Sequence, residues 1–372
     1  MGPLLGITKS EIPEINFQDK FLKPIWEKVL NDEDLTLSDG VKILQTEDFA
    51  SVGIMADSIT NTITGDKVYF VLNRHINPTN ICVLSCKFCD FAKKPGDKDA
   101  YEMSIDQILD EMDDEISEVH IVGGHHPSWE FSHYVEMVKS IHDKYPKVQI
   151  KAFTASEIDY FYRRWKITPE ESLSILKEAG LDSMPGGGAE VFSDRIHKML
   201  LPGKATGDRW LDIHRIAHNM DIKSNCTLLY GHVETFEERV DHLIKLRNLQ
   251  NETNGFLAFI PLEYQIGTTL LRKRHTTPFD DLKMIAASRL ILNNVKYIKS
   301  YWVMLGESTA SIGLNFGAND LDGTIGKERI AHAALANSPA GRAREKMVNS
   351  IKDAGRIPVE RDALYNEIKV YA

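Results

Sequence analysis

The sequence contains few cysteines, four among 372 residues. Their uneven spacing does not give the paired framework of a small secreted protein held by disulfides. A reducing cytosol is therefore the expected compartment, and clustered thiols there more often bind metal. The opening residues, MGPLLGITKSEIPEINF, lack a basic region and turn polar at once. No secretory signal is expected, and the predicted location is cytoplasmic.

Long apolar runs and an excess of positive charge are also missing. No run approaches about eighteen apolar residues, so no transmembrane helix is expected. The chain has 44 Lys and Arg against 54 Asp and Glu, a formal net charge of −10. This charge argues against non-specific binding to nucleic acid or to an anionic membrane. We therefore expect neither nucleic acid nor membrane among the partners.

Short β-branched or aromatic runs alternate with polar turns and with segments of helical spacing. No internal repeat and no low-complexity tract is present. Eight strands with intervening helices predict an α/β fold, a (βα)8 TIM-type barrel over residues 67–372 with helices at its C-terminal end. The candidate strands are Val68–Asn73, Val119–Gly124, Val148–Phe153, Leu181–Gly186, Asn225–Gly231, Gly255–Leu262, Lys299–Leu305 and Ala318–Gly323.

Residues 1–66 differ from the rest and predict a helical extension. FLKPIWEKVL and LSDGVKILQ have helical spacing, and we expect them to pack across one end of the barrel. Later helix starts are marked by capping boxes, in which a Ser or Thr is followed three residues on by Glu or Gln. Such boxes begin at Ser104, Thr168 and Thr235.

Polar and glycine-rich residues follow nearly every candidate strand. GGHHP follows the second strand, PGGGAE the fourth and GHVE the fifth. In a parallel barrel these strand ends converge on one face, where active sites are built. Loops are polar in general, but glycine clusters and paired histidines at so many exits favour a catalytic site.

Three of the four cysteines, Cys82, Cys86 and Cys89, lie within eight residues after the first candidate strand. Cysteine thiolates hold iron–sulfur clusters, and three ligands leave one iron of a four-iron cluster open. A catalytic metal needs such an open position for substrate. Two alternatives are structural zinc with His75 as fourth ligand and unrelated buried thiols. Cys226 lies far away in a candidate strand and is expected in the core.

The segment NICVLSCKFCDF resembles the radical S-adenosylmethionine superfamily, whose signature C-x3-C-x-Φ-C has an aromatic Φ, here Phe88. The resemblance implies a [4Fe–4S] cluster on the three cysteines. It also implies that S-adenosylmethionine chelates the fourth iron and that one electron cleaves it to a 5′-deoxyadenosyl radical. The electron would come from an external donor of the flavodoxin or ferredoxin type.

The same resemblance implies cofactor contacts outside the cysteine segment. Gly123 and Gly124 would approach the methionine amino group with their backbone, because they carry no Cβ. Glu190 would accept hydrogen bonds from the ribose hydroxyls. Arg209 would pair with the methionine carboxylate, which a guanidinium can hold with two hydrogen bonds. Phe88 would pack near the adenine.

Candidate substrate contacts come from the ends of several strands. His125 and His126 are candidates to orient substrate or to move protons near neutral pH. Either can instead cap the next helix, and at most one is expected to touch substrate. The candidates, in no firm order, are Arg74, His75, His125, His126, His232, Glu234 and Asp320.

From Val68 onward, VGGHHP, DSMPGGGAE, PGKATGDRW, LLYGHVETFEERVDHL and FLAFIPL resemble the aminofutalosine synthases of the futalosine route to menaquinone. This implies a small-molecule substrate, 3-[(1-carboxyvinyl)oxy]benzoate, to which the radical adds. S-adenosylmethionine is then a co-substrate, and the products are 6-amino-6-deoxyfutalosine, methionine and bicarbonate.

Other assignments stay open at this point. The dehypoxanthine futalosine cyclases share the cysteine motif and both glycine loops; PGKATGDRW and Leu262, where a cyclase has tryptophan, favour the synthase. His125 and the segment LEYQIGTTLLRKRH depart from the synthase pattern, in which an apolar residue and a PENT-like turn are expected. Deazaflavin-precursor synthase subunits and a non-catalytic metal-binding scaffold are further alternatives.

Overall fold

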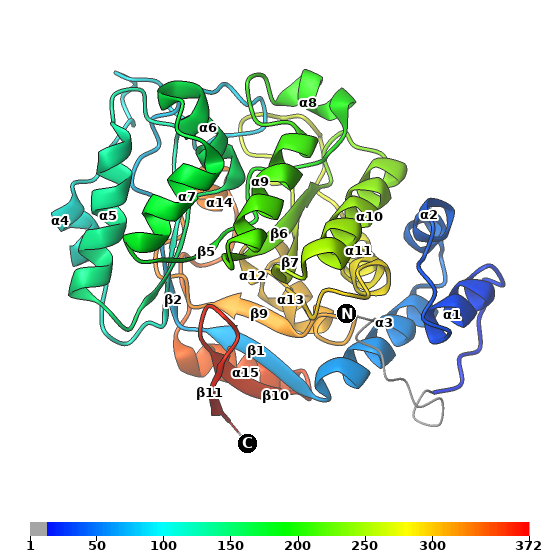
Figure 1. The fold of residues 1–372 in the computed structure, drawn as a ribbon. Coiled ribbons are helices and arrows are strands. Elements are labelled where there is room, and N and C mark those ends of the chain that lie inside the picture. Colours follow the sequence, from blue (N-terminus) through cyan, green and yellow to red (C-terminus); the bar gives the residue numbers. More distant parts are fainter. Residues whose placement is uncertain (1–12, 372) are drawn as a thin grey trace.

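A computed structural model describes residues 13–371. Its larger sheet is parallel, seven-stranded and curled, with the strand order β2-β3-β4-β5-β6-β7-β8 (Figure 1). The strand order follows the chain order, as expected of a barrel built from successive βα units. The bounds are β2 Asn73–Ile76, β3 Glu118–Ile121, β4 Gln149–Ala152, β5 Leu181–Met184, β6 Lys223–Tyr230, β7 Phe256–Glu263 and β8 Tyr297–Ile298.

Strand β9 (Asp320–Gly323) lies between β8 and the beginning of the barrel. On one side Ser300 donates its backbone N–H to Asp320, at 2.8 Å. On the other side β9 pairs in parallel with β1 (Lys67–Val71), which runs directly into β2. The predicted (βα)8 TIM-type fold is confirmed, with β9 as the strand that brings the two ends of the curled sheet together.

A second, four-stranded sheet has the order β11-β10-β1-β9. It adds β10 (Ile357–Arg361), parallel to β1, and β11 (Glu367–Val370), antiparallel to β10. Figure 1 shows this sheet below the barrel, with helix α15 beside β10. The sequence reading missed β10 and β11, because IPVER and EIKV are short and strongly polar.

Two predicted strands were wrong in detail. Val68–Asn73 is split, so that most of it forms β1 of the second sheet and the barrel begins at Asn73. Lys299–Leu305 is not a strand; the strand β8 precedes it, and Trp302–Leu305 forms the helix α12. Tyr301–Leu305 consists mainly of aromatic and branched residues, which have high β propensity and led to the prediction of a strand. Trp302–Leu305 is instead packed as a helix, because β propensity depends on the surroundings of a segment.

The helices cover the outside of the barrel (Figure 1). The predicted capping boxes at Ser104, Thr168 and Thr235 are all formed. The helices of the barrel region are α4 Ile105–Asp110, α5 Phe131–Lys144, α6 Ala155–Trp165, α7 Pro169–Glu178, α8 Asp194–Leu200, α9 Gly207–Asn219, α10 Phe236–Thr253, α11 Pro278–Ile291, α12 Trp302–Leu305, α13 Glu307–Gly313, α14 Ile330–Ala333 and α15 Arg344–Asp353.

Three further helices precede the barrel: α1 Leu22–Leu30, α2 Leu37–Gln45 and α3 Phe49–Thr64. α2 and α3 pack against the outer helices α10 and α11, and α1 packs on α2 and α3, so the three helices do not lie across an end of the barrel. Gly40 of α2 lies so close to Val240 that a Cβ there would be 2.6 Å from its Cγ1. We propose that residues 1–66, whose first twelve lie outside the described part, are an extension of the barrel.

The barrel and its covering helices share one apolar core, which includes Trp210, Phe259 and Ile285. Within residues 13–371, no helix has both the length and the hydropathy that a membrane span needs.

Candidate active site

A cavity of about 310 Å³ opens among the carboxyl ends of the barrel strands. Its lining comes from every strand of the larger sheet or from the loop that follows it. The three clustered cysteines lie at one part of the lining. The side walls are largely apolar and include Val122, Leu229, Ile260, Leu262, Tyr301 and Met304.

The cysteine segment is folded by backbone hydrogen bonds and by one lysine. Cys82 donates its N–H to the Lys93 carbonyl at 2.9 Å, and Cys89 donates to the Cys86 carbonyl at 3.2 Å. The Lys94 ammonium donates to three successive carbonyls, those of residues 82–84, at 2.6–3.2 Å. These contacts fix the loop although it contains no helix or strand.

The Gly123–Gly124 turn packs directly against this loop. Gly124 donates its N–H to the Thr79 carbonyl at 2.9 Å. A Cβ on Gly124 would lie 2.3 Å from the Ile81 carbonyl oxygen, closer than any side chain permits. The absence of a side chain is therefore needed for the loop that carries Cys82, whatever else the turn contacts.

The thiols lie in a partly apolar environment. Burial raises the pKa of Cys86 to about 11 and also raises that of Cys89, although Lys204 opposes both shifts. Thiols with such pKa values are protonated, so binding a metal must release protons. Among residues 13–371 no three His, Cys, Asp or Glu side chains surround a single point as a mononuclear metal requires. A zinc site with His75 as fourth ligand therefore has no geometric support.

Glu190 lies in the cavity lining beside the cysteines. It adopts a left-handed backbone conformation, with φ of 49°, after the three glycines of PGGGAE. Its carboxylate accepts a 2.6 Å hydrogen bond from the Lys204 ammonium, which also lies 5.3 Å from the centre of the Phe88 ring. Lys204, Glu190 and Phe88 thus form one contiguous group at the cysteine end of the cavity.

Some predicted site residues lie elsewhere. Arg209 pairs with Asp159 at 3.1 Å and stacks over the Tyr162 ring, and it is not part of the cavity lining. Arg74 pairs with Asp113 and lines a separate surface pocket.

Three further predicted residues are buried outside the cavity. His232 and Glu234 form a pair at 3.1 Å, and Glu234 also binds Arg239. Asp320 lies lower in the barrel, where Arg361 holds it at 2.8 Å.

The two neighbouring histidines have different positions. His126 accepts hydrogen bonds from the backbone N–H groups of Ser128 and Trp129, and it pairs with Glu102. It therefore serves the local turn before α5. His125 lines the cavity, stacked on Tyr160 at 4.9 Å, with its backbone N–H 3.4 Å from the Cys82 sulfur.

Burial lowers the pKa of His125 to about 3. The side chain is therefore neutral at physiological pH. An imidazole in this state gives the cavity a polar surface without a charge.

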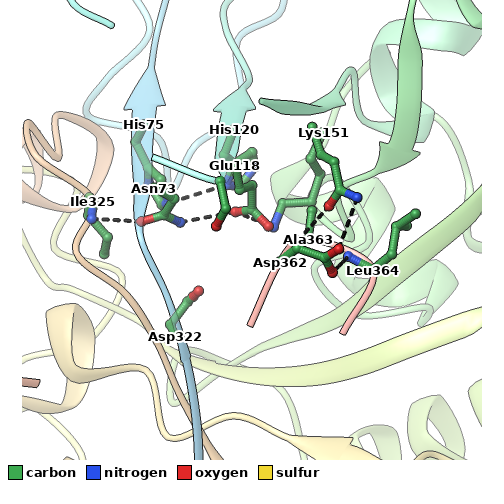
Figure 2. Close-up of polar contacts among 12 residues, drawn as sticks. Asn73, His75, Glu118, His120, Lys151, Asp322, Ile325, Asp362, Ala363 and Leu364 are labelled. Carbon is green, nitrogen blue, oxygen red and sulfur yellow. Dashed lines mark hydrogen bonds and ion pairs between the residues drawn. The ribbon is translucent and has the colours of Figure 1, made fainter. Parts of the chain in front are cut away.

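The far end of the cavity, which we call the cavity floor, is formed by His75, His120, Lys151, Lys299 and Asp322. His75 and His120 approach each other at 3.3 Å between their ring nitrogens. Figure 2 shows both rings on neighbouring strands, with Glu118 on the adjacent layer. Lys151 pairs with Glu118 at 2.7 Å, and Lys299 pairs with Asp322 at 2.8 Å.

Several lining residues were missed by the sequence reading: His120, Lys151, Glu157, Lys204 and Lys299. Lys151 gave a usable signal, because it interrupts the apolar run VQIKAF in a candidate strand. A lysine at such a position is rarely buried unless it is paired. The others sit in segments whose side-chain direction the sequence does not reveal.

Comparison with known proteins gives matches along most of the chain. The profile of the Radical SAM superfamily matches residues 76–246, and that of the CofH/MqnC C-terminal region matches residues 253–371. An aminodeoxyfutalosine synthase of Thermus thermophilus is 41% identical over 363 residues, which is 95% of this chain and 98% of the relative. The enzyme of the same name from Streptomyces coelicolor is 38% identical over 361 residues, with 93% of each chain covered.

A third relative has a different name. The 5-amino-6-(D-ribitylamino)uracil–L-tyrosine 4-hydroxyphenyl transferase of Methanococcoides burtonii is 35% identical over 346 residues, covering 90% of this chain and 96% of the relative.

Among solved structures, a methylornithine synthase has a TM-score of 0.72 at 18% identity, covering 90% of this chain and 97% of that one. The hydrogenase maturase HydG from Carboxydothermus hydrogenoformans has a TM-score of 0.70 at 14% identity, covering 92% of this chain and 80% of that one. At these identities the likeness concerns the fold.

Glu157 gives a prediction about stability and pH. Its buried carboxyl accepts hydrogen bonds from Thr154 and from the Gly123 N–H, yet burial raises its pKa from 4.5 to about 7. The folded state therefore binds its proton more tightly than the unfolded state, so wild-type stability falls as pH rises from about 4.5 to 7. We expect Glu157→Gln to gain about 3 kcal/mol relative to wild type between pH 4.5 and 8.

Urea denaturation of both proteins at several pH values measures this difference. Glu171→Gln is the matched control, because Glu171 has the same capping-box role at the exposed start of α7. A difference between wild type and Glu157→Gln that stays constant across this range would contradict the prediction.

Proposed function

This chain belongs to the radical S-adenosylmethionine superfamily as an enzyme that forms carbon–carbon bonds, and we propose that its reaction is the synthesis of 6-amino-6-deoxyfutalosine. The substrates are 3-[(1-carboxyvinyl)oxy]benzoate and S-adenosylmethionine. The observation that carries the proposal is the 41% identity to an aminodeoxyfutalosine synthase over nearly the full length of both chains.

The reaction balances as a redox-neutral addition. One electron cleaves the sulfonium to methionine and a 5′-deoxyadenosyl radical, whose carbon forms a bond to the vinyl CH₂ of the substrate. The aryl group then migrates from the ether oxygen to the neighbouring carbon, so that the aryl–oxygen bond breaks, an aryl–carbon bond forms and the oxygen becomes a ketone. The carboxyl group on that carbon leaves with water as bicarbonate. The electron taken up at the start is given back, so no further oxidant is required.

Cys82, Cys86 and Cys89 are the residues that hold the [4Fe–4S] cluster, the cofactor of the superfamily. Their fit rests on three thiols without a disulfide that line one end of the cavity, in a loop fixed by Lys94. When bound, the cluster supplies the electron that cleaves S-adenosylmethionine.

Lys204 and Glu190 are the proposed anchors of S-adenosylmethionine. Glu190 accepts from the ribose hydroxyls, and Lys204 takes the role in carboxylate binding that the sequence reading gave to Arg209. The support is position: both residues line the cavity beside the cysteines, whereas Arg209 faces Asp159.

The lining of the cavity also favours addition of the radical to the substrate. It excludes water and other molecules from which the radical could abstract hydrogen. A reactive carbon must meet the alkene at near-attack distance, about 3–3.5 Å. Apolar walls that include Ile260 and Leu262 exclude water and hold an aromatic ring. The neutral His125 adds no cation beside the sulfonium.

An external one-electron donor completes the proposed system, as a flavodoxin or ferredoxin. The cysteine segment reaches the surface, where Val83, Ser85 and Lys87 are exposed. A donor that docks there would come close to the cluster ligands.

The competing reaction is the one named for the archaeal relative, transfer of a 4-hydroxyphenyl group from tyrosine to 5-amino-6-(D-ribitylamino)uracil. It is favoured by 35% identity over 90% of this chain. The two reactions differ in the fate of the adenosyl carbon, which makes them separable by isotope.

We expect the adenosyl skeleton to be retained in the product. S-adenosylmethionine labelled in its adenosyl moiety, incubated anaerobically with reductant and 3-[(1-carboxyvinyl)oxy]benzoate, should give labelled 6-amino-6-deoxyfutalosine by mass spectrometry. The parallel reaction supplies tyrosine and 5-amino-6-(D-ribitylamino)uracil. Label that appears only in 5′-deoxyadenosine, together with turnover of the second substrate pair, would refute the proposal.

The cysteine assignment predicts a clear difference between variants. Cys82→Ala, Cys86→Ala and Cys89→Ala should each deplete iron and abolish turnover, since each removes a thiolate ligand. Cys226→Ala is the control, because Cys226 is fully buried in β6 away from the cavity lining. Iron analysis and the visible spectrum of anaerobic protein measure the outcome. Normal iron in Cys86→Ala would show that the ligand set is wrong.

Replacing Lys204 should weaken S-adenosylmethionine binding more than replacing Arg209. Loss of one charge-assisted hydrogen bond costs about 1.5–3 kcal/mol, so Lys204→Met should lower affinity about tenfold or more. Arg209→Met should change it little. Equilibrium titration of the cluster-loaded proteins tests this, with iron content as the check on integrity. The reverse order would return the carboxylate contact to Arg209.

A further inference from the structure

We propose that the cavity floor is a binding subsite for a carboxylate, with Lys151, Lys299 and His120 as the groups that contact it. Naming the ligand rests on the proposed function: it is the ring carboxylate of the benzoate. The subsite itself is argued from the floor residues, and the sequence did not lead us to expect Lys151, Lys299 or His120 to bind substrate.

Strand register brings these groups together. His75 of β2, His120 of β3 and Lys151 of β4 are direct partners across three neighbouring parallel strands. Side chains at the same level of a barrel point into a common layer. Lys299, just after β8, and Asp322 of β9 complete the layer from the other side. Five separate strand positions thus meet at one end of the cavity.

Both lysines of the cavity floor have N–H donors that make no hydrogen bond to the described residues. An ammonium has three N–H donors and no acceptor. Among the described contacts, Lys151 donates to Glu118 and Lys299 donates to Asp322, one hydrogen bond each. Both side chains are buried, with 4% and 1% of their surface exposed. Buried donors are normally satisfied, so the remaining N–H groups are suited to an acceptor brought by a ligand.

His120 provides an independent indication. Its Nε2 atom is buried and has no hydrogen-bond partner in residues 13–371, while its Nδ1 faces His75. Burial lowers the pKa of both imidazoles, so both are neutral at physiological pH. In the tautomer that carries its proton on Nε2, His120 has an N–H donor that no residue of the described chain accepts from. A ligand oxygen there would satisfy the unpaired atom.

A buried carboxylate, that of Glu118, holds Lys151 in position. Glu118 is fully buried and also accepts from Asn73 at 3.0 Å (Figure 2). Burial alone would raise the pKa of Glu118, but Lys151, Lys299 and Arg361 outweigh it and hold that pKa well below its usual range. Glu118 is therefore a fixed anion, and it positions Lys151 without being part of the cavity lining.

The charged groups and hydrogen-bond donors of the cavity floor determine which chemical group of a ligand can bind there. Two ammonium groups are balanced by two carboxylates, so net charge alone does not attract an anion. Among the floor residues that line the cavity, two ammonium groups face one carboxylate, that of Asp322. A carboxylate is the group that only accepts, with two oxygens and about four lone-pair sites. A ligand ammonium would meet the two lysine cations, and Asp322, the one carboxylate among the five floor residues, is already paired with Lys299.

The position of the floor also decides which carboxylate binds. The attacked CH₂ must lie at the cysteine end, next to S-adenosylmethionine, and the carboxyl group on the vinyl carbon stays beside it. The ring carboxylate is the group that reaches the opposite end. The ring itself then lies between the apolar walls.

Two probes that cannot react test the subsite: 3-ethoxybenzoate and its neutral counterpart 3-ethoxybenzamide. Their dissociation constants are measured anaerobically on the cluster-loaded enzyme with S-adenosylmethionine and without reductant. We expect wild type to bind the benzoate at least tenfold more tightly than the benzamide. Equal binding of the two probes would overturn the proposal.

Variants then locate the preference. The paired replacements Lys299→Met with Asp322→Asn and Lys151→Met with Glu118→Gln leave no unpaired carboxylate of these two ion pairs. Each should reduce the benzoate preference to about threefold or less. Lys283→Met is the matched control, because Lys283 binds the Leu44 carbonyl on the outside of the barrel. An undiminished preference in both floor variants would place the carboxylate elsewhere. Iron content and the thermal transition identify any variant that does not fold, and the wild-type ratio remains decisive in that case.

The subsite and the proposed reaction can fail separately. A benzoate preference that depends on Lys299, without formation of 6-amino-6-deoxyfutalosine, would refute the reaction and keep the subsite. Formation of the product by a protein that binds both probes equally would refute the subsite and keep the reaction.

Discussion

The barrel interior contains charges that must be paired, and this requirement organises much of the structure. Glu118 pairs with Lys151, Lys299 with Asp322, and Asp320 with Arg361, and all six side chains are buried. Removing one partner of such a pair leaves an uncompensated buried charge and typically costs about 3–5 kcal/mol. Each pair joins different strands. Together they fix how β3, β4, β8, β9 and β10 face one another and thus where the cavity ends.

The second sheet has a structural role that follows from these pairs. β10 brings Arg361 under the barrel, where it meets Asp320 of β9, and the next residues close the base. Gln149 of β4 donates to Asp362 at 3.1 Å and accepts from the Ala363 N–H at 2.7 Å. The region matched by the CofH/MqnC C-terminal profile therefore supplies part of the wall, the base and part of the charge balance.

The sequence was informative where chemistry requires a local pattern. The spacing of Cys82, Cys86 and Cys89 and the two glycine loops marked one end of the cavity, because these features depend on neighbours in the chain. The floor was not predictable in this way. Lys151 and Lys299 are 148 residues apart in the numbering and meet only through barrel closure. The position of the Arg209 side chain could not be predicted from the sequence, because it pairs with Asp159, which lies on a different helix.

The pairing at the base has a consequence for how the chain folds during synthesis. Ser117, at the edge of β3, donates to the Arg361 carbonyl across 244 positions of sequence. Contacts this distant form late, since the entropy of closing the intervening loop comes first. Glu118 and Asp320 therefore lack the balancing charge of Arg361 until β10 has been synthesised. In that interval β2–β5 form a partial sheet with unpaired edges, which makes the incomplete chain prone to aggregate.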